Sequence, residues 1–343
     1  MHNTQENSVS VFIIPNHKLE GAQNFFRRLH EQISFKHKHL FIEEENNLLN
    51  NLFKLVQLNK KKKFNVFTTV NSNKIGLIFK ILHPSANLYM RLGNTISQEI
   101  RKSSIKYFYH KLFYSISIRK CSKFIFQSKV MKNDFINFFE FKNNKKFIVI
   151  HNGIPEAIKT DESEYIVPDN KVNFLLVGTF KKQKGYDIFL DSLDSLTTHL
   201  KNSIHFHICG SGNDFQNFKK LLEMKNLDSF VSLYGHISPN LFYSKCDVYI
   251  LPSRFEGFSN SLVEALSFGM PAIVSDCPSA NREVIIKNFN GIFFNNLDHE
   301  DLAEKITYMK DNYNKFNKSD IIADTFKRFS IKTISEKYKN LTQ

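Results

Sequence analysis

Two glutamates eight positions apart, Glu256 and Glu264, are the residues of this chain best placed to do chemistry. Small and amide-bearing residues lie between them, and an apolar run at 248–251 precedes them. A glycine-rich turn that leads into a helix presents backbone N–H groups and the positive end of the helix dipole, which suits a phosphate. A carboxylate on such a helix can accept hydrogen bonds from a diol such as a ribose, and one in the loop can face a sugar hydroxyl. Either glutamate alone would more often be a solvated surface residue, so the prediction depends on the surrounding pattern.

Short apolar runs alternate with helical patterns along the chain, and these elements must position the glutamates. Strands are predicted at 9–14, 64–70, 88–92, 124–127 and 147–150, and then at 172–177, 204–209, 230–233, 248–251, 272–274 and 291–294. Helices are predicted at 23–32, 74–82, 100–123 and 129–139, and then at 186–200, 214–225, 239–244, 298–313 and 330–341. Ser238 is expected to cap the helix at 239–244, with Pro239 in its first turn. The alternation favours a parallel sheet with helices on both faces in each half.

Two further loops follow predicted strands of the second half, where ligands of open parallel sheets bind. Residues 178–185, GTFKKQKG, include Lys184, whose charge suits a phosphate but which by itself would be a solvated loop lysine. Gly210-Ser211-Gly212 follows the predicted strand 204–209 and would let the backbone approach a nucleotide. A lone G-x-G is more often a simple turn, so this second loop is the weaker indication.

The stretch 248–285, VYILPSRFEGFSNSLVEALSFGMPAIVSDCPSANREVI, resembles the E-x7-E motif of retaining glycosyltransferases of the GT-B fold, in particular the large family 4 group. Residues 148–155, IVIHNGIP, resemble the segment that closes the first domain in that family. The resemblance implies an α/β fold of two Rossmann-like domains whose parallel sheets face each other across a cleft. It places an N-terminal acceptor-binding domain at 1–165 and a C-terminal nucleotide-sugar-binding domain at 170–329. A terminal helix at about 330–343 would pack back on the first domain, and the acidic segment 161–170 would be the linker.

The resemblance also implies roles for individual residues. Glu256 would contact the transferred sugar, and Lys184 would neutralise the departing diphosphate; these two are the expected catalytic residues. Thr179 stands where the family has an arginine. The candidates to replace it are Lys181 or Lys182, although a lysine is a point charge rather than a bidentate fork, and another arginine such as Arg254. The complete expected donor site consists of Gly178, Thr179, Lys184, Gly210, Gly212, Arg254, Glu256, Gly257, Phe258, Ser259, Asn260 and Glu264.

The acceptor side is expected in the first half, on fewer residues. The first loop of the family is glycine-rich, and here only Gly21 remains of that pattern. Family members often carry a histidine or another polar residue after a middle strand, and here Arg91 and Asn94 occupy that place. A simple turn would account for Asn94 equally well.

The family implies transfer of a hexose from a nucleotide diphosphate, with retention of anomeric configuration. The expected donor is a UDP-hexose or a UDP-N-acetylhexosamine, and the expected acceptor is a saccharide or a polyprenyl-linked saccharide. Residues 276–283, DCPSANRE, resemble members that make capsule, O-antigen or lipopolysaccharide. No D-x-D motif and no metal-ligand spacing of histidines occurs in the sequence, so we expect neither a metal nor another cofactor.

The positive charge of the chain lies almost entirely in its first half. Residues 1–165 contain 26 Lys and Arg against 13 Asp and Glu, whereas the remainder contains 21 against 20. Within that half, the segment 100–123 interleaves basic with aromatic and aliphatic residues. This pattern suits an anionic membrane surface, although an ordinary helix with a core stripe and a solvated basic face would read the same. Nucleic acid is the other partner that charge alone suggests, and we consider it the less favoured one.

We expect a cytoplasmic protein that is peripheral on the inner face of a bacterial cytoplasmic membrane. No stretch of about eighteen apolar residues and no signal-peptide pattern occurs, and the four cysteines show no C-x-x-C spacing. Three other functions stay open at this stage: a nucleotide-sugar epimerase of the same fold, a noncatalytic nucleic-acid-binding protein, and a degenerate transferase kept as a scaffold.

Overall fold

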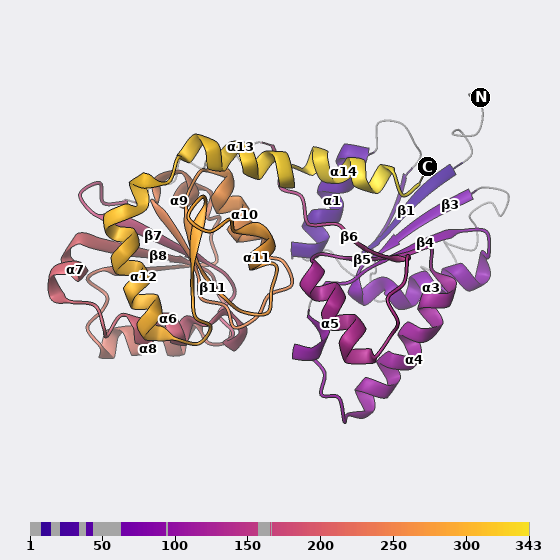
Figure 1. Cartoon of the computed structure of the whole chain (residues 1–343), viewed down its shortest axis with the longest axis horizontal. Coiled ribbons are helices and arrows are strands. Elements are labelled where there is room, and N and C mark those ends of the chain that lie inside the picture. The colour runs from indigo at the N-terminus through magenta and orange to yellow at the C-terminus, as the bar shows by residue number, and fades with distance from the viewer. Residues whose placement is uncertain are drawn as a thin grey trace. The chain divides into compact units, whose positions relative to one another are not determined.

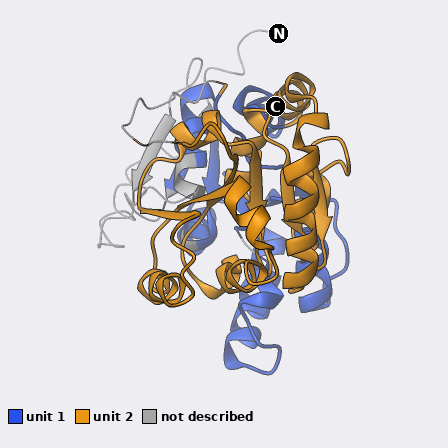
Figure 2. Ribbon diagram, turned by 90° about the vertical axis from the view of Figure 1, so that its left-hand side faces the viewer, with its two compact units in different colours: residues 1–155, 329–343 blue, residues 156–328 orange. Residues whose placement is uncertain are grey.

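The computed structural model describes residues 8–14, 21–33, 39–43, 63–93, 95–156, 165 and 167–342. The chain divides into two compact units (Figure 2): unit 1 comprises residues 1–155 and 329–343, and unit 2 comprises residues 156–328. Half of the linker predicted at 161–170, residues 161–164 and 166, lies outside the described residues.

Unit 1 contains a six-stranded parallel sheet with the strand order β2-β1-β3-β4-β5-β6 (Figure 1). Its strands are β1 (Ser8–Ile14), β2 (His39–Glu43), β3 (Lys63–Thr68), β4 (Asn87–Arg91), β5 (Lys123–Phe126) and β6 (Phe147–Val149). Its helices are α1 (Gly21–Ile33), η1 (Val70–Ser72), α3 (Asn73–Leu82), η2 (Ile96–Gln98), α4 (Ile105–Lys120), α5 (Lys129–Phe139) and α14 (Ile331–Lys339).

The strands of unit 1 are apolar on both faces because helices cover both faces. Successive side chains of a strand point to opposite faces. Accordingly, Phe12, Phe67 and Tyr89 pack with α1 and α14, whereas their neighbours Val11 and Met90 pack in a second cluster with α3, α4 and α5. Near-continuous apolar strands of this kind are typical of a parallel sheet buried on both faces.

The end of the chain returns to unit 1. Ile154 forms a bridge with Ser330, in which Ile154 N donates to Phe329 O at 2.9 Å and Ile331 N donates to Ile154 O at 2.7 Å. Ser330 then caps α14 by accepting from Thr333 N, and α14 packs against α1. Helix α14 therefore belongs to the same compact unit as the first strands.

Unit 2 contains a second six-stranded parallel sheet, with the order β12-β11-β10-β7-β8-β9. Its strands are β7 (Val172–Val177), β8 (Ile204–Cys209), β9 (Val231–Gly235), β10 (Val248–Leu251), β11 (Ala272–Ser275) and β12 (Gly291–Phe294). Its helices are η3 (Lys182–Lys184), α6 (Tyr186–Ser192), α7 (Thr198–Ser203), α8 (Phe215–Met224), α9 (Asn240–Lys245), α10 (Asn260–Ser267), α11 (Asn281–Val284), α12 (His299–Asn312), η4 (Tyr313–Lys315) and α13 (Lys318–Phe329).

The structure confirms the predicted strands to within about two residues and corrects five other elements. The helix predicted at 186–200 is two helices, α6 and α7, because Ser192 bonds back to Phe189 O and Thr197 caps a new helix. Helix α9 begins at Asn240 with Pro239 as its N-cap residue, so the predicted cap from Ser238 is wrong. Helix α1 begins at Gly21 rather than at residue 23. The sequence reading omitted β2 and α13, the first because its apolar run is short.

Candidate functional site

Three loops at the carboxyl edge of the unit 2 sheet form the candidate site. They follow β7, β8 and β10, and β7 lies between the other two strands in the sheet. Gly210, directly after β8, lies so close to the β7 loop that a Cβ atom there would be 1.9 Å from the carbonyl oxygen of Gly178. A side chain at residue 210 would therefore push these two loops apart. A hydrogen bond from Phe180 N to Ser211 O, 2.9 Å long, holds the two loops together just before Gly212.

A lysine–glutamate pair joins the first and third loops. Lys184 Nζ lies 2.5 Å from Glu256 Oε1, and the Ser253 hydroxyl donates to the same oxygen at 2.8 Å. The Lys184 side chain is 18% exposed and that of Glu256 is 8% exposed. The lysine stem passes close to Gly178, because a Cβ atom there would be 3.5 Å from Lys184 Cδ. The structure thus brings together three residues that the sequence predicted as donor ligands.

The backbone beside Lys184 requires a glycine. Gly185 has a left-handed φ of 70°, and a Cβ atom there would lie 2.0 Å from the Pro252 carbonyl oxygen. Two hydrogen bonds hold the same contact: Gln183 Nε2 donates to Phe255 O at 3.0 Å, and Arg254 N donates to Gln183 O at 2.8 Å. These contacts fix the lysine loop against the loop that carries Glu256.

Glu264 lies on α10, the helix that follows the third loop. Ser259 caps α10 by accepting from Leu262 N, as expected for a serine before the first helical residue. The Tyr243 hydroxyl donates to Glu264 Oε2 at 3.3 Å. Burial, followed by the charge of Glu264, raises the pKa of Tyr243 well above its usual value, so the phenol stays a donor. Glu256 and Glu264 therefore flank the start of one helix, with the predicted residues Gly257, Phe258, Ser259 and Asn260 between them.

Arg254, a predicted donor ligand, is bound to other residues of unit 2. Its guanidinium binds both carboxylate oxygens of Asp187 at 2.6 Å and also donates to Lys182 O at 2.9 Å. Burial opposes ionisation of Asp187, but the hydrogen bond and charge of Arg254 outweigh it and lower the pKa of Asp187. Three donor contacts thus hold Arg254 to α6 and η3. Thr179, at the place of the missing arginine, is exposed.

The acceptor candidates are in unit 1 and are not brought together in the same way. Arg91, the last residue of β4, is 1% exposed and its guanidinium carbon lies 4.6 Å from the centre of the Phe25 ring. It donates through Nη2 to Asn152 Oδ1. Its burial means that contact with an acceptor would require the covering α1 and α14 to move. Gly21 is the first residue of α1, and Asn94 lies outside the described residues.

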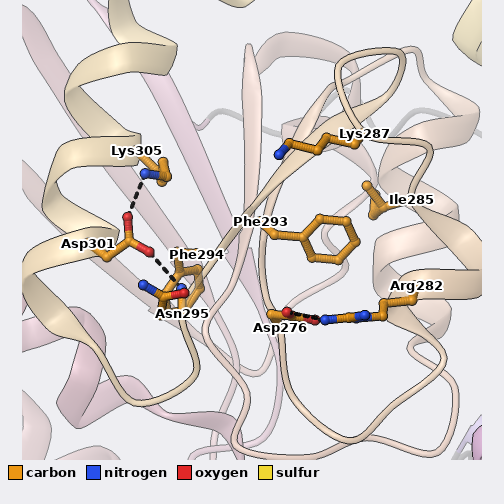
Figure 3. Close-up of a pocket in the computed structure, with 9 residues that line it drawn as sticks. All are labelled: Asp276, Arg282, Ile285, Lys287, Phe293, Phe294, Asn295, Asp301 and Lys305. Atoms are coloured by element: carbon orange, nitrogen blue, oxygen red, sulfur yellow. Dashed lines mark hydrogen bonds and ion pairs between the residues drawn. The ribbon is translucent and has the colours of Figure 1, made fainter.

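A separate pocket of about 610 Å³ lies beside β12 (Figure 3). Four of its charged groups form two pairs: Arg282 binds Asp276 through two bonds of 2.6 and 2.5 Å, and Lys305 Nζ lies 2.5 Å from Asp301 Oδ1. The pocket is lined by Asp276, Arg282, Ile285, Lys287, Phe293, Phe294, Asn295, Asp301 and Lys305. None of the predicted donor residues is among them, so this pocket is distinct from the candidate site.

The structure adds two site residues that the sequence reasoning missed, Ser253 and Tyr243. Ser253 could have been suspected, since it lies three residues before Glu256 in the same loop. Tyr243 lies 21 positions before Glu264 and reaches it only through the packing of α9 against α10. No cluster of three or more His, Cys, Asp or Glu that could hold a metal ion occurs within the described part of the chain.

Comparison with protein families decides the membership of the chain. A family model described as "Glycosyl transferases group 1" matches residues 152–323, just over half of the chain. The chain belongs to this family. The resemblance predicted from the E-x7-E stretch is therefore confirmed, and the matched residues include every predicted donor ligand.

Individual relatives match over part of their length. An uncharacterized glycosyltransferase of Methanocaldococcus jannaschii is 31% identical over 217 residues, which is 62% of this chain and 56% of that protein. The O-antigen biosynthesis glycosyltransferase WclY of Escherichia coli is 25% identical over 255 residues, 68% of this chain and 69% of that protein. The chain thus spans little more than half of the first of these relatives.

Solved structures show the same fold over nearly the whole chain. The Anabaena protein HepE, crystallised in complex with UDP and glucose, has a TM-score of 0.79 at 15% identity and covers 97% of this chain and 98% of its own. Two Rossmann-like units with parallel sheets are the GT-B fold, so the predicted fold is confirmed.

Proposed function

We propose that this protein is a retaining glycosyltransferase that moves a hexose or an N-acetylhexosamine from a UDP-linked donor to a saccharide or lipid-linked saccharide. The acceptor would belong to bacterial surface polysaccharide synthesis, such as that of capsule, O-antigen or lipopolysaccharide. Family membership supports group transfer, and the O-antigen relative supports the class of acceptor. The bound UDP and glucose of HepE support the donor class.

The observation that carries the proposal is the contact between Lys184 and Glu256 at the strand ends of unit 2. A partly exposed lysine held against a carboxylate keeps its ammonium at a fixed point beside the backbone of Gly178. An ammonium at that point can neutralise a diphosphate that lies across the β7 and β8 loops. The start of α10 contributes the positive end of a helix dipole on the other side.

The proposed reaction needs no further co-reactant. The bond between the anomeric carbon and the diphosphate oxygen breaks, and positive charge develops on the sugar while negative charge develops on the diphosphate. Lys184 and the α10 end stabilise the diphosphate, and Glu256 faces the sugar. The acceptor oxygen bonds to the anomeric carbon on the face that the diphosphate leaves, and its proton passes to the departing phosphate oxygen. Lys184 and the helix end supply the positive charge, so we propose that the transfer is metal-independent.

The second part of the proposal concerns the place of the reaction. Among the described residues, no helix combines the length and apolar composition that crossing a bilayer requires. We propose that the basic first half holds the protein to the anionic inner surface of the cytoplasmic membrane, where a polyprenyl-linked acceptor would be presented.

Thermal stabilisation by nucleotides tests the donor assignment. The purified chain would be heated with UDP, GDP or CMP and with their common sugar conjugates. A ligand that binds only the folded state at a hundred times its Kd adds about 2.7 kcal/mol to stability, enough to raise the Tm measurably. We expect stabilisation by UDP and one UDP-sugar, and a much smaller shift in Glu264→Ala because the ribose loses its acceptor.

The matched control is Glu223→Ala, which removes a surface glutamate from α8 of the same unit. It should respond to UDP like the wild type. No shift with any nucleotide would contradict the proposed function and favour a degenerate scaffold. A shift with GDP or CMP alone would replace the UDP assignment while keeping the site.

A further inference from the structure

Helix α4 carries an apolar row on the side that faces solvent. The row consists of five residues at helical spacing, and we call it the outer stripe: Ile105, Phe108, Tyr109, Leu112 and Ile116. Their exposed fractions are 89%, 65%, 49%, 63% and 42%. At 3.6 residues per turn these positions fall within one face of the helix. The stripe is therefore a continuous apolar surface rather than scattered exposed side chains.

The outer stripe is not needed to hold α4 in the fold. The opposite face of the helix already supplies the core contacts, through Tyr107 and Tyr114, which are 4% exposed and belong to the core cluster under α3, α4 and α5. Helix α4 is thus apolar on two faces, and only one of them is used within unit 1. A second, exposed apolar face marks an interaction surface.

Unpaired positive charges border the outer stripe. Lys106, Arg119 and Lys120 are exposed, and within the described part of the chain no ion pair involves any of them. The nearby carboxylate of Glu140 is engaged instead with Lys102 at 2.7 Å and Lys111 at 3.4 Å. The apolar row therefore ends in cations that are available to a negatively charged partner.

Positive charge is concentrated at the end of α4. Burial and then the charges of Lys120 and Lys146 lower the pKa of Lys80. Lys146 Nζ also donates to the carbonyl of Ile118, at the last turn of the helix. At the stripe itself, Lys74 of α3 lies over the Tyr109 ring at 5.2 Å, so α3 and α4 are side by side (Figure 1).

We infer that the outer stripe of α4 is a membrane-docking surface, which inserts Phe108, Leu112 and their neighbours among lipid chains while the flanking lysines and arginine bind anionic headgroups. Apolar side chains on one face with basic residues at the margin are the composition of an interfacial helix. Each basic residue near an anionic bilayer adds electrostatic attraction. The biological role of this docking surface rests on the proposed lipid-linked acceptor, whereas the experiment that tests it does not.

Charge and composition distinguish this partner from the alternatives. A second copy of the chain would place Lys106, Arg119 and Lys120 against their own copies or against other basic residues of unit 1, which repel. A nucleic acid would be attracted by the cations but would leave the aliphatic residues of the stripe in water. A bilayer with anionic lipids satisfies both the apolar row and its basic border.

Vesicle binding by the full chain, measured by flotation, tests the inference. The probes are phosphatidylcholine vesicles with and without phosphatidylglycerol. We expect the wild type to bind the anionic vesicles. The double variant Phe108→Asp, Leu112→Asp should bind more than about tenfold more weakly, because two side chains that would insert into the lipid are replaced by charges that the lipids repel. Met224→Asp, which replaces a 78% exposed methionine on α8 of unit 2, should bind like the wild type. Arg119→Ala with Lys120→Ala should weaken binding to the anionic vesicles only.

A fluorescence reporter places the contact on α4 without disrupting it. The chain contains no tryptophan, so Leu112→Trp and Met224→Trp each introduce a single emitter. Tryptophan is well suited to the membrane interface, and anionic vesicles should shift the emission of Leu112→Trp to shorter wavelength while leaving Met224→Trp unchanged. Equal shifts at both positions, or binding by the double aspartate variant at wild-type strength, would overturn the inference.

The test separates this inference from the proposed function. Vesicle binding needs neither donor nor acceptor, and UDP stabilisation needs no vesicles. UDP stabilisation without α4-dependent vesicle binding would remove the docking surface and leave the transferase. Self-association of the wild type that the aspartates abolish, without vesicle binding, would assign the stripe to a second copy and also overturn the inference.

Discussion

Each unit places a basic side chain near the carboxyl end of its parallel sheet, and the two side chains have opposite surroundings. Lys184 in unit 2 is partly exposed and lies against the Glu256 carboxylate. Arg91 in unit 1 is enclosed by aromatic rings, and within the described residues its Nε and Nη1 atoms have no hydrogen-bond partner. Burial lowers the pKa of Arg91, while the Tyr338 hydroxyl acts in the opposite direction without reaching hydrogen-bond geometry.

The position of a cation in the sheet topology therefore does not determine its role. Lys184 can meet a ligand because its side chain is partly exposed and its contact with Glu256 fixes where its ammonium points. Arg91 is positioned to organise loops: Asn152 accepts from it, and Asn152 Nδ2 donates in turn to Gln127 Oε1 at 3.3 Å. Gln127 then donates to the carbonyls of Leu92 and Gly93. We therefore expect substitutions of the two cations to change different measured quantities.

The largest effect should come from Lys184→Ala. Loss of the charge that stabilises the departing diphosphate should lower kcat/KM by about 10² to 10³-fold, as for removal of one such electrostatic contact in other enzymes. The rate would be measured with the UDP-sugar that stabilises the chain. Lys219→Ala is the matched control, because it removes a lysine from the surface pair with Glu223 in the same unit. Wild-type turnover by a folded Lys184→Ala protein would refute the catalytic assignment.

Arg91→Ala should act on stability. Removing the side chain leaves a cavity between β4, α1 and α14, which we expect to cost about 2–3 kcal/mol of unfolding free energy. Arg91→Met fills most of that volume without a buried charge and should cost less than about 1.5 kcal/mol. Urea unfolding of both variants measures this. Equal losses in the two variants would show that the charge, and not the volume, is what the site requires.

The sequence predicted the charged residues of the unit 2 loops because their patterns are local. Lys184 and Glu256 each lie in a loop whose neighbouring residues define the pattern. The alternation of apolar runs likewise predicted both sheets, since each strand is buried on both faces. These parts of the fold depend on short stretches that a reader of the sequence can inspect.

The partners of these residues were not predictable in the same way. Arg254 was a candidate phosphate ligand until the fold placed Asp187, 67 residues away, against it. Arg91 was a candidate acceptor residue because it ends a strand, and only the return of α14 showed it to be enclosed. Long-range packing decides whether a charge is exposed or paired, and short sequence patterns carry no information about it.

A smaller effect should appear in the pH dependence of stability, through a buried histidine of unit 2. His207 on β8 is buried, with Nδ1 2.9 Å from Tyr234 Oη and Nε2 3.0 Å from Asn173 Oδ1. Burial, followed by the charge of His205, lowers the pKa of His207 from 6.5 to about 3. The unfolded chain therefore binds a proton that the folded chain resists, so stability is full above pH 6.5 and falls as the pH drops toward 3. We expect a loss of about 1–2 kcal/mol between pH 7 and pH 5.

His207→Gln tests that loss, because a neutral amide does not titrate. Its Tm at pH 7 should be lower than that of the wild type, since one of the two hydrogen bonds is lost, but its Tm should fall less between pH 7 and pH 5. A variant whose Tm falls as steeply as that of the wild type would show that other groups cause the acid sensitivity.

The smallest effect should come from Tyr243→Phe, which tests Glu264 separately from Glu256. Glu256 is held by a cation and a serine, whereas Glu264 accepts a 3.3 Å bond from a buried phenol. Removing that hydroxyl should weaken UDP binding by about twofold to fivefold, because a neutral hydrogen bond contributes about 0.5–1 kcal/mol and the aromatic ring still packs. Calorimetric titration with UDP measures the change, and Tyr249→Phe is the control, since that hydroxyl binds Ser261 and not a glutamate. An effect as large as that of Glu264→Ala would mean that Glu264 binds the ribose only when Tyr243 orients it.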